Sequence, residues 1–199
     1  MPHFPPMPIA RRALTGGLLA LAAVPARAET RKRYAFDQKS GTLEFTARHL
    51  GFLTSTGRFD NFQAELLIDP DRPLTSHVSA TVRTGQIEIA YPGAVDLLRS
   101  PEFFDVAQFP EARFTGAATG EGSLQRFTLA GDLTVRGITR PFRMEARLLG
   151  RERDAALGAD VASFSATGDM KRSEFGMVSD TASISDTIRL SVRVRIVIA

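Results

Sequence analysis

The chain has no cysteine and no tryptophan, and only two tyrosines and three histidines occur among its 199 residues. Without cysteine there is no disulfide framework, no thiolate nucleophile and no attachment site for c-type haem. Beyond the first 28 residues only His49 and His77 remain as imidazoles, and two isolated histidines make a poor zinc or copper site. We therefore predict no metal site and no covalently attached cofactor.

The first 28 residues have the pattern of a cleaved secretory signal peptide. Arg11 and Arg12 precede an apolar run over residues 13–24 that is too short for a membrane span, and Ala26-Arg27-Ala28 has the small-x-small form of a cleavage site. We expect export to the periplasm by the Sec route or, because two arginines are adjacent, by the twin-arginine route. A retained anchor is the less favoured alternative. Residues 29–199 then form one domain.

Removal of the signal peptide also removes the excess of positive charge. The full chain carries a formal net charge of +3, and the three arginines of residues 1–28 account for all of it. The remaining domain has as many basic as acidic residues, so it lacks the positive charge that binding to nucleic-acid phosphates requires. We expect no nucleic-acid partner.

Alternation of apolar and polar residues is the main structural signal. It is clearest in residues 188–198, IRLSVRVRIVI, where every second side chain is apolar and arginine fills most of the gaps. Similar runs begin near Leu43, Phe62, Val78, Phe127, Phe142 and Phe164. Short alternating segments separated by turn residues indicate an antiparallel sandwich or barrel. Phe59 and Phe62 are three residues apart, which predicts a bulge or turn at Asp60-Asn61.

Residues 91–114 break the alternation and are rich in phenylalanine. Val95–Arg99 fits a short helix between Gly93 and Pro101, and Ser100-Pro101-Glu102 has the form of a second helix start. Four phenylalanines follow within residues 103–114. This segment either closes one end of a barrel or lines a cleft for an apolar ligand, and the two interpretations are compatible.

Few residues are candidates for chemistry. The chain has no G-x-S-x-G nucleophile elbow, and no acid stands out as a partner for His49. A lone histidine on an apolar strand face is usually a hydrogen-bonded core residue, but it could also meet a ligand head group. Arg99, Asp105 and Arg172 are exposed or paired in the simplest interpretation, and the alternative is that they support the Phe-rich segment or contact a carbonyl or phosphate at a barrel mouth.

Five stretches, in this order, resemble the YceI-like family of exported proteins: YAFDQKSGTLEFTARHLGF, GRFDNFQAELLIDPD, LLRSPEFFDVAQFPEARF, GDLTVRGITRPF and KRSEFGM. The resemblance spans roughly Tyr34 to Ile198. It implies an all-β, eight-stranded antiparallel lipocalin-like barrel, with the short helical, Phe-rich insertion and a long apolar pocket. The family is associated with polyisoprenoid lipids, including isoprenoid quinones, and is not in general catalytic.

The resemblance also implies ligand-binding positions. Those carried over are Phe45, His49, Leu50, Phe52, Phe103, Phe104, Phe109, Arg172 and Phe175, to which the apolar faces and the Phe-rich segment add Phe62, Leu98, Phe114 and Phe164. One stretch departs from the family pattern. AVDLLRS places Val95 and Leu97 where aspartate and histidine are usual, which puts the polarity of the ligand in question.

Three functions are compatible with these observations. The favoured one is a non-catalytic periplasmic protein that binds or carries an isoprenoid lipid or quinone, in transient contact with the membrane or a respiratory membrane protein. The second is an enzyme for a lipid-like substrate with His49 as base. The third is an outer-membrane barrel with its apolar face outward, but such barrels carry aromatic girdles and this chain has little tyrosine and no tryptophan.

Overall fold

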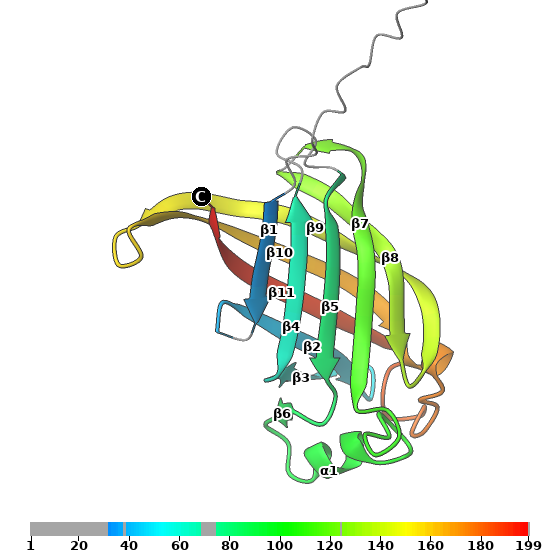
Figure 1. Cartoon of the computed structure of the whole chain (residues 1–199). Helices are drawn as coiled ribbons and strands as arrows, with labels where there is room; N and C mark the ends of the chain where they lie inside the picture. The colour runs from blue at the N-terminus through cyan, green and yellow to red at the C-terminus, as the bar shows by residue number, and fades with distance from the viewer. Residues whose placement is uncertain (1–31, 38, 69–74, 124, 199) are drawn as a thin grey trace, which may run out of the picture.

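The structure is a computed structural model that describes residues 32–198 except 38, 69–74 and 124 (Figure 1). The predicted signal peptide lies outside the described residues. Antiparallel strands dominate: β1 (Lys32–Asp37), β2 (Gly41–His49), β3 (Leu53–Phe59), β4 (Phe62–Ile68), β5 (His77–Arg83), β6 (Ile87–Ile89), β7 (Glu111–Ser123), β8 (Arg126–Val135), β9 (Ile138–Asp154), β10 (Ala159–Lys171) and β11 (Thr187–Ile198).

These strands form one curled sheet in the order β1-β4-β5-β7-β8-β9-β10-β11-β2-β3-β6. Every pair is antiparallel, as the short alternating segments predict. The sequence-based expectation of an all-β antiparallel fold is confirmed. The number of strands differs, because the described residues contain eleven strands rather than eight.

The extra strands arise partly from a pair of facing breaks. β3 and β4 are separated only by Asp60 and Asn61, and β5 and β6 only by Thr84–Gln86. The breaks are hydrogen bonded to each other, since the Asp60 amide donates to the Gln86 carbonyl and the Arg83 amide to the Asn61 carbonyl, both at 2.9 Å. The chain bends here and continues, so β3 with β4 and β5 with β6 join the two ends of the sheet. The predicted bulge at Asp60-Asn61 is therefore the point where the sheet curls back on itself.

The apolar side of the alternation faces inward. In β11, Leu190 and Val192 contact the interior, whereas Arg189 on the outer face binds the Asp169 carboxylate of β10 at 2.8 and 2.9 Å. Similar exposed pairs cover other strands, including Arg33–Glu65 and Arg58–Glu88. Because successive side chains of a strand point to opposite faces, one alternating sequence builds both the apolar lining and the charged exterior.

The helix predicted after Gly93 is present as α1 (Ala94–Arg99) and follows Gly93 in the left-handed conformation at φ 77°. A second helix starting at Ser100 does not form, and residues 101–104 are turns. The chain instead folds back, because the Asp105 amide donates to the Ser100 carbonyl at 2.8 Å while Asp105 itself adopts φ 47°. A short 3-10 helix, η2 (Arg172–Phe175), follows β10.

Candidate functional site

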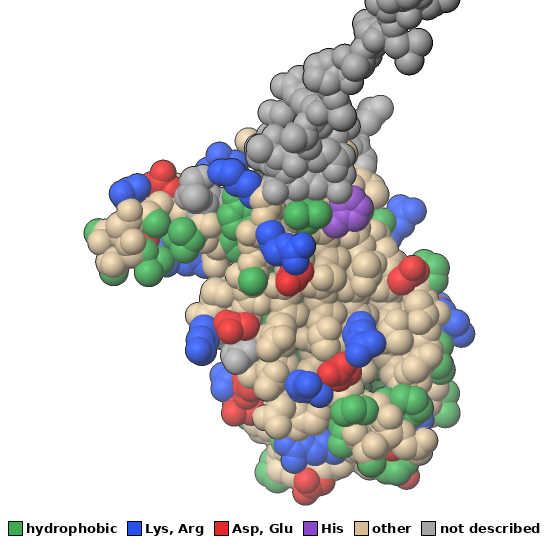
Figure 2. Space-filling view, viewed as in Figure 1, with side chains coloured by type: hydrophobic (Ala, Val, Ile, Leu, Met, Phe, Trp, Pro, Cys, Tyr) green, Lys and Arg blue, Asp and Glu red, His purple; other side chains and the backbone are tan. Residues whose placement is uncertain are grey.

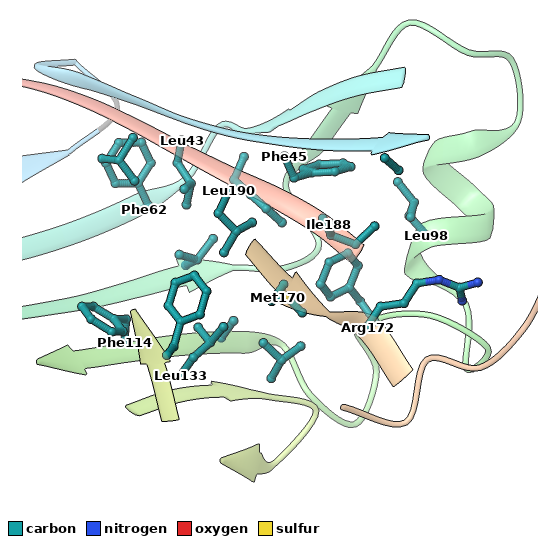
Figure 3. Close-up of a pocket in the computed structure, with 18 of the residues that line it drawn as sticks. Leu43, Phe45, Phe62, Leu98, Phe114, Leu133, Met170, Arg172, Ile188 and Leu190 are labelled. Atoms are coloured by element: carbon teal, nitrogen blue, oxygen red, sulfur yellow. The ribbon is translucent and has the colours of Figure 1, made fainter. Parts of the chain in front are cut away.

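The curled sheet surrounds a cavity of ≈ 760 Å³. That volume lies within the range of about 300–1,000 Å³ that is usual for small-molecule sites. In Figure 3 the labelled lining side chains from β2, β4, β7, β8, β10 and β11 point toward a common space. The lining is almost entirely aliphatic, aromatic or alanine, so the cavity suits a long apolar molecule rather than a polar one.

Most of the predicted ligand-binding residues lie in this lining: Phe45, His49, Leu50, Phe62, Leu98, Phe103, Phe104, Phe114, Phe164 and Arg172. Strands β2 and β4 supply Phe45 and Phe62 from their inward faces, whereas Leu98, Phe103 and Phe104 come from α1 and the turns that follow it. The structure therefore brings together residues that are far apart in the chain. Whether each one contacts a ligand stays a prediction.

Three predicted residues do not line the cavity. Phe52 sits in the β2–β3 turn and is 76 % exposed. Phe109 lies under the β8–β9 turn, where its ring packs 3.1 Å from the position a Cβ would take at Gly137. Phe175 is buried in the core beside β8–β11, because η2 places its side chain in the packed layer rather than in the cavity lining. Phe175 thus supports the lining from behind. Phe52 lies on the surface, and Phe109 packs against the β8–β9 turn.

The sequence interpretation missed a large part of the lining. Strands β8 to β11 contribute inward-facing side chains that were not predicted as site residues, including Leu129, Leu133, Phe142, Met144, Met170, Ile188, Leu190, Val192 and Val194. The alternation in residues 188–198 carried this signal, since it already marked one apolar face. The alternation alone does not show whether such a face borders a cavity or packs in a solid core.

Phenylalanines form part of the cavity wall at the α1 end. The ring centroids of Phe45 and Phe59 are 5.3 Å apart, and Phe104 meets Phe59 edge to face at 5.8 Å. Phe45 lies across Gly57 of the neighbouring strand, where any Cβ would collide with the ring. The Phe-rich segment therefore covers part of this end of the barrel and lines the cavity, which joins the two interpretations of residues 91–114.

Side chains from neighbouring turns fasten the Phe-rich segment to the barrel. The guanidinium of Arg136 donates to the carbonyls of Pro101, at 2.7 Å, and of Phe103. The buried Thr84 hydroxyl donates to the Phe109 carbonyl at 2.8 Å. Arg99 is exposed, as the simplest interpretation has it, and it also donates to the Gly85 carbonyl at 2.9 Å, a contact of the supporting kind that the alternative interpretation described. Arg136 was not predicted from the sequence.

Arg172 is a charged residue that is only 2 % exposed. Its guanidinium donates to four backbone carbonyls of the 177–185 loop, those of Met177, Ser179, Ile184 and Ser185, at 2.6–3.1 Å. It also lies 5.8 Å from the centre of the Phe103 ring. Figure 3 shows the alkyl part of Arg172 at the cavity wall and the guanidinium turned away from the other labelled side chains. Arg172 therefore holds the loop in place rather than presenting its charge to the cavity.

Asp186 ends the same loop and joins it to η2. Its carboxylate accepts hydrogen bonds from the Ser173 amide and the Ser173 hydroxyl, both at 2.9 Å. Burial alone would raise the pKa of the Asp186 carboxyl, but the two hydrogen bonds from Ser173 and the charges of Arg172 and Lys171 outweigh it and lower that pKa. The carboxylate form thus stabilises the folded loop.

The cavity reaches solvent at the end that carries α1. Four large apolar side chains of the lining are exposed there, namely Leu50, Leu53, Tyr91 and Leu97, and we call these four residues the rim. They come from the β2–β3 turn and from the segment between β6 and the end of α1. Strands β3 and β6 are antiparallel, with Gly57 opposite Ile89, so the Leu53 end of β3 lies on the same side of the sheet as the segment that follows β6. The rim residues therefore lie at one end of the cavity.

The β2–β3 turn holds an apolar residue in a strained conformation. Leu50 has φ 51° and Gly51 has φ 80°, and the Phe52 amide donates to the His49 carbonyl at 3.2 Å. This is the geometry of a type I′ turn, whose first central position favours asparagine because leucine has a steric cost of about 1–2 kcal/mol there. Leu50 is also 61 % exposed, so neither its conformation nor its solvation favours leucine.

A few polar groups lie just inside the rim. His49 is half-buried in the lining, and its side chain has no hydrogen bond to another described residue. Ser55 and Ser183 line the same end, and the 177–185 loop is tied to the turn by a hydrogen bond from the Leu50 amide to the Ser183 carbonyl at 2.8 Å. These groups can donate to or accept from one polar head group at the opening.

Comparison with known protein families matches residues 34–196 to the YceI-like domain. The chain belongs to the YceI-like family. This YceI-like protein is 30 % identical over 183 residues to the UPF0312 protein YE1254 of Yersinia enterocolitica, an alignment that covers 91 % of this chain and 93 % of the relative. The resemblance found in the sequence motifs is thereby confirmed.

Solved structures share the fold of this YceI-like protein. The crystal structure of Burkholderia cenocepacia BcnA matches with a TM-score of 0.69 at 18 % identity, over 80 % of this chain and 98 % of that one. A polyisoprenoid binding domain from Saccharophagus degradans matches with a TM-score of 0.58 at 11 % identity, over 84 % of this chain and 98 % of that one. At these identities the likeness establishes the lipocalin-like fold alone.

Two further findings concern the described residues of the YceI-like chain. Within them, no cluster of three or more histidine, aspartate or glutamate side chains has a geometry that could hold a metal ion. In the same part of the chain, no helix has the length and apolar character needed to cross a bilayer.

Proposed function

We propose that this protein is a non-catalytic periplasmic carrier that holds an isoprenoid lipid, such as a polyprenol or an isoprenoid quinone, in its barrel cavity. The observation that supports this most directly is the ≈ 760 Å³ cavity with its nearly continuous apolar lining. The related fold of a domain described as polyisoprenoid binding agrees with this ligand class. Export to the periplasm rests on the signal-peptide pattern of residues 1–28.

The energetics need no catalytic group. Each buried methylene contributes about 0.8 kcal/mol, so a tail of ten to fifteen carbons gains roughly 8–12 kcal/mol before the costs of association. Micromolar affinity corresponds to about 8.2 kcal/mol. Before those costs, burial of a tail of two or three prenyl units is therefore worth micromolar affinity or better.

The head group of the proposed ligand lies at the α1 end, where His49, Ser55 and Ser183 line the opening. A quinone carbonyl can accept a hydrogen bond from the His49 imidazole, and a hydroxyl head group can bond to the same nitrogen in either direction. His49 has no hydrogen-bonded acid partner among the described residues, which favours this role over that of a catalytic base.

The direct test is organic extraction of protein purified from the periplasm of cells that express the full-length chain, followed by mass spectrometry. We expect a prenol or quinone in near-stoichiometric amount, and uptake of added ubiquinone or farnesol by protein that has been delipidated. Preparations that contain no lipid and take up neither compound would contradict the proposal. Recovery of the full-length chain with residues 1–28 intact in the cytoplasm would contradict the location.

A further inference from the structure

The surface around the cavity opening carries exposed apolar side chains. Tyr91 is 67 % exposed in the rim, and two apolar neighbours outside the cavity lining extend it. These are Phe52, next to Leu53 in the β2–β3 turn, and Val178, which is 61 % exposed and follows Met177 of the lining. Figure 2 shows hydrophobic side chains gathered at the end of the molecule where Figure 1 places α1, with charged groups of both signs around them.

We infer that the rim, with Phe52 and Val178, docks on the surface of a phospholipid bilayer and lets the ligand pass between membrane and cavity without crossing water. This inference rests on the proposed function. The same rim residues, Leu50 and Leu53 among them, face both the solvent and the cavity, so an apolar path runs from the exterior to the lining. A hydrocarbon tail that leaves a bilayer through water must expose its methylenes to solvent, and contact at the rim avoids that cost.

The chemistry of the patch fits a bilayer better than a protein partner. Its members stand on separate turns beside the cavity opening, so the patch lacks the continuous packed core that a stable protein interface requires. Tyr91 combines an apolar ring with a hydroxyl, the kind of side chain that gathers at the membrane–water interface. Position 50 holds an exposed leucine although the turn conformation favours asparagine. Insertion of this side chain into lipid would explain why leucine is present there.

The charges near the opening indicate which lipids matter. α1 carries one exposed acid and one exposed base, Asp96 and Arg99, and Asp180 of the 177–185 loop also lines the cavity. These charges are of both signs and the rim itself is uncharged, so docking depends on apolar insertion rather than on anionic head groups. Zwitterionic vesicles should therefore bind the protein, and added salt should change binding little.

The experiment compares two serine substitutions of exposed apolar residues in protein purified from the full-length chain. Phe52→Ser removes a patch residue that does not line the cavity, and Leu157→Ser removes an exposed leucine from the β9–β10 hairpin. The probes are phosphatidylcholine vesicles, for co-sedimentation, and farnesol-loaded vesicles, for ligand transfer. We expect Phe52→Ser to lower vesicle partitioning about tenfold and to slow transfer, while Leu157→Ser behaves as the unsubstituted protein.

Binding of farnesol added from ethanol separates the two proposals. If neither variant nor the unsubstituted protein binds farnesol this way, the carrier function fails, whatever the vesicle result. If all three bind it equally but Phe52→Ser and Leu157→Ser transfer it at the same rate, the docking surface is wrong. A transfer rate that does not rise with the concentration of farnesol-loaded vesicles, or a dimer that forms through the rim without lipid, would also overturn it. Val178→Ser repeats the test should Phe52→Ser fail to fold.

Discussion

The inner and outer faces of the curled sheet come from the same strands, but the inner face is apolar and borders a cavity whereas the outer face is charged and hydrated. The inner face in β11 is Ile188, Leu190 and Val192, and it borders a cavity. The alternate residues of the same strand form the outer face, which carries exposed ion pairs such as Arg189–Asp169. Exposed pairs contribute little to stability, so the outer face mainly presents hydrated charge to the solvent. The inner face can leave space unfilled because the hydrogen-bonded ladder, rather than dense packing, keeps its shape.

Arg172 differs from both faces, since it is charged like the outer residues yet buried like the inner ones. Its stabilising effect comes from four carbonyl contacts instead of a carboxylate partner. Substitutions on the inner face, on the outer face and at the boundary between them should therefore have different effects on stability and ligand binding.

The largest effect is expected for Arg172→Ala. The substitution leaves four carbonyls of the 177–185 loop without their donor, so the free energy of unfolding should fall by about 3 kcal/mol or more. Urea denaturation followed by circular dichroism measures it. The outer-face control, Arg189→Ala, breaks an exposed pair and should leave the midpoint nearly unchanged. Equal shifts for the two variants would mean that burial of the guanidinium does not matter.

Filling the cavity should come next in size and should act on ligand binding. Ala80 of β5 lines the cavity between Ala64 and Phe114, so Ala80→Trp places an indole where the tail lies. Overpacking of about 1–3 kcal/mol predicts a loss of affinity for ubiquinone or farnesol of about tenfold or more. Ser79→Trp adds the same ring to the exposed outer face and should leave affinity unchanged. Fluorescence titration distinguishes these results.

Leu50→Asn tests the boundary between the faces. Asparagine suits a left-handed turn position, so the variant should be more stable than the unsubstituted protein by about 1 kcal/mol. Thermal unfolding measures the gain. The comparison is Leu53→Asn, at a rim residue in an ordinary strand conformation, which should gain nothing. If Leu50→Asn instead lowers the unfolding temperature, the Leu50 side chain stabilises the fold by packing, and its exposure at the opening does not explain why leucine is there.

The smallest effect is expected from Asp186→Asn and concerns pH. Since the pKa of Asp186 is lowered in the folded protein, its carboxylate stabilises the fold above the ordinary pKa near 4, and that contribution is lost as the pH falls toward the folded value. The unsubstituted protein should lose stability between about pH 5 and pH 2 more steeply than the variant. Denaturation midpoints measured across that range test this. If the midpoints of the two proteins change with pH by the same amount, the Asp186 carboxylate does not contribute to the pH dependence of stability.

Much of the fold could be predicted because strand alternation is a local property. The runs around Phe45, Phe62 and Leu190 each specify which side chains share a face, and the spacing of Phe59 and Phe62 predicts the break at Asp60-Asn61. The family-like motifs and the apolar faces then located part of the lining in β2, β4 and the Phe-rich segment. The lining of β8 to β11 was equally visible as alternation, but apart from Phe164 it was not predicted as part of the site.

Other features could not be predicted, because they depend on residues far apart in the chain. Nothing in the sequence around Arg136 indicates that it binds the carbonyl of Pro101, 35 positions away. The turn by itself does not show whether Phe52 or Leu53 faces the cavity, and the structure places Phe52 on the surface and Leu53 in the lining. The same holds for Phe109 and Phe175, whose rings lie against other elements.

By itself, the sequence determined seven of the strands, their two faces and the short helix after Gly93, since backbone geometry and side-chain alternation act between near neighbours. Only the tertiary structure decided that the apolar faces enclose a ≈ 760 Å³ cavity and do not meet in a solid core. That outcome depends on the radius at which the sheet curls. The radius follows from strand register and from the facing breaks at Asp60-Asn61 and Thr84–Gln86, which join segments distant in the chain.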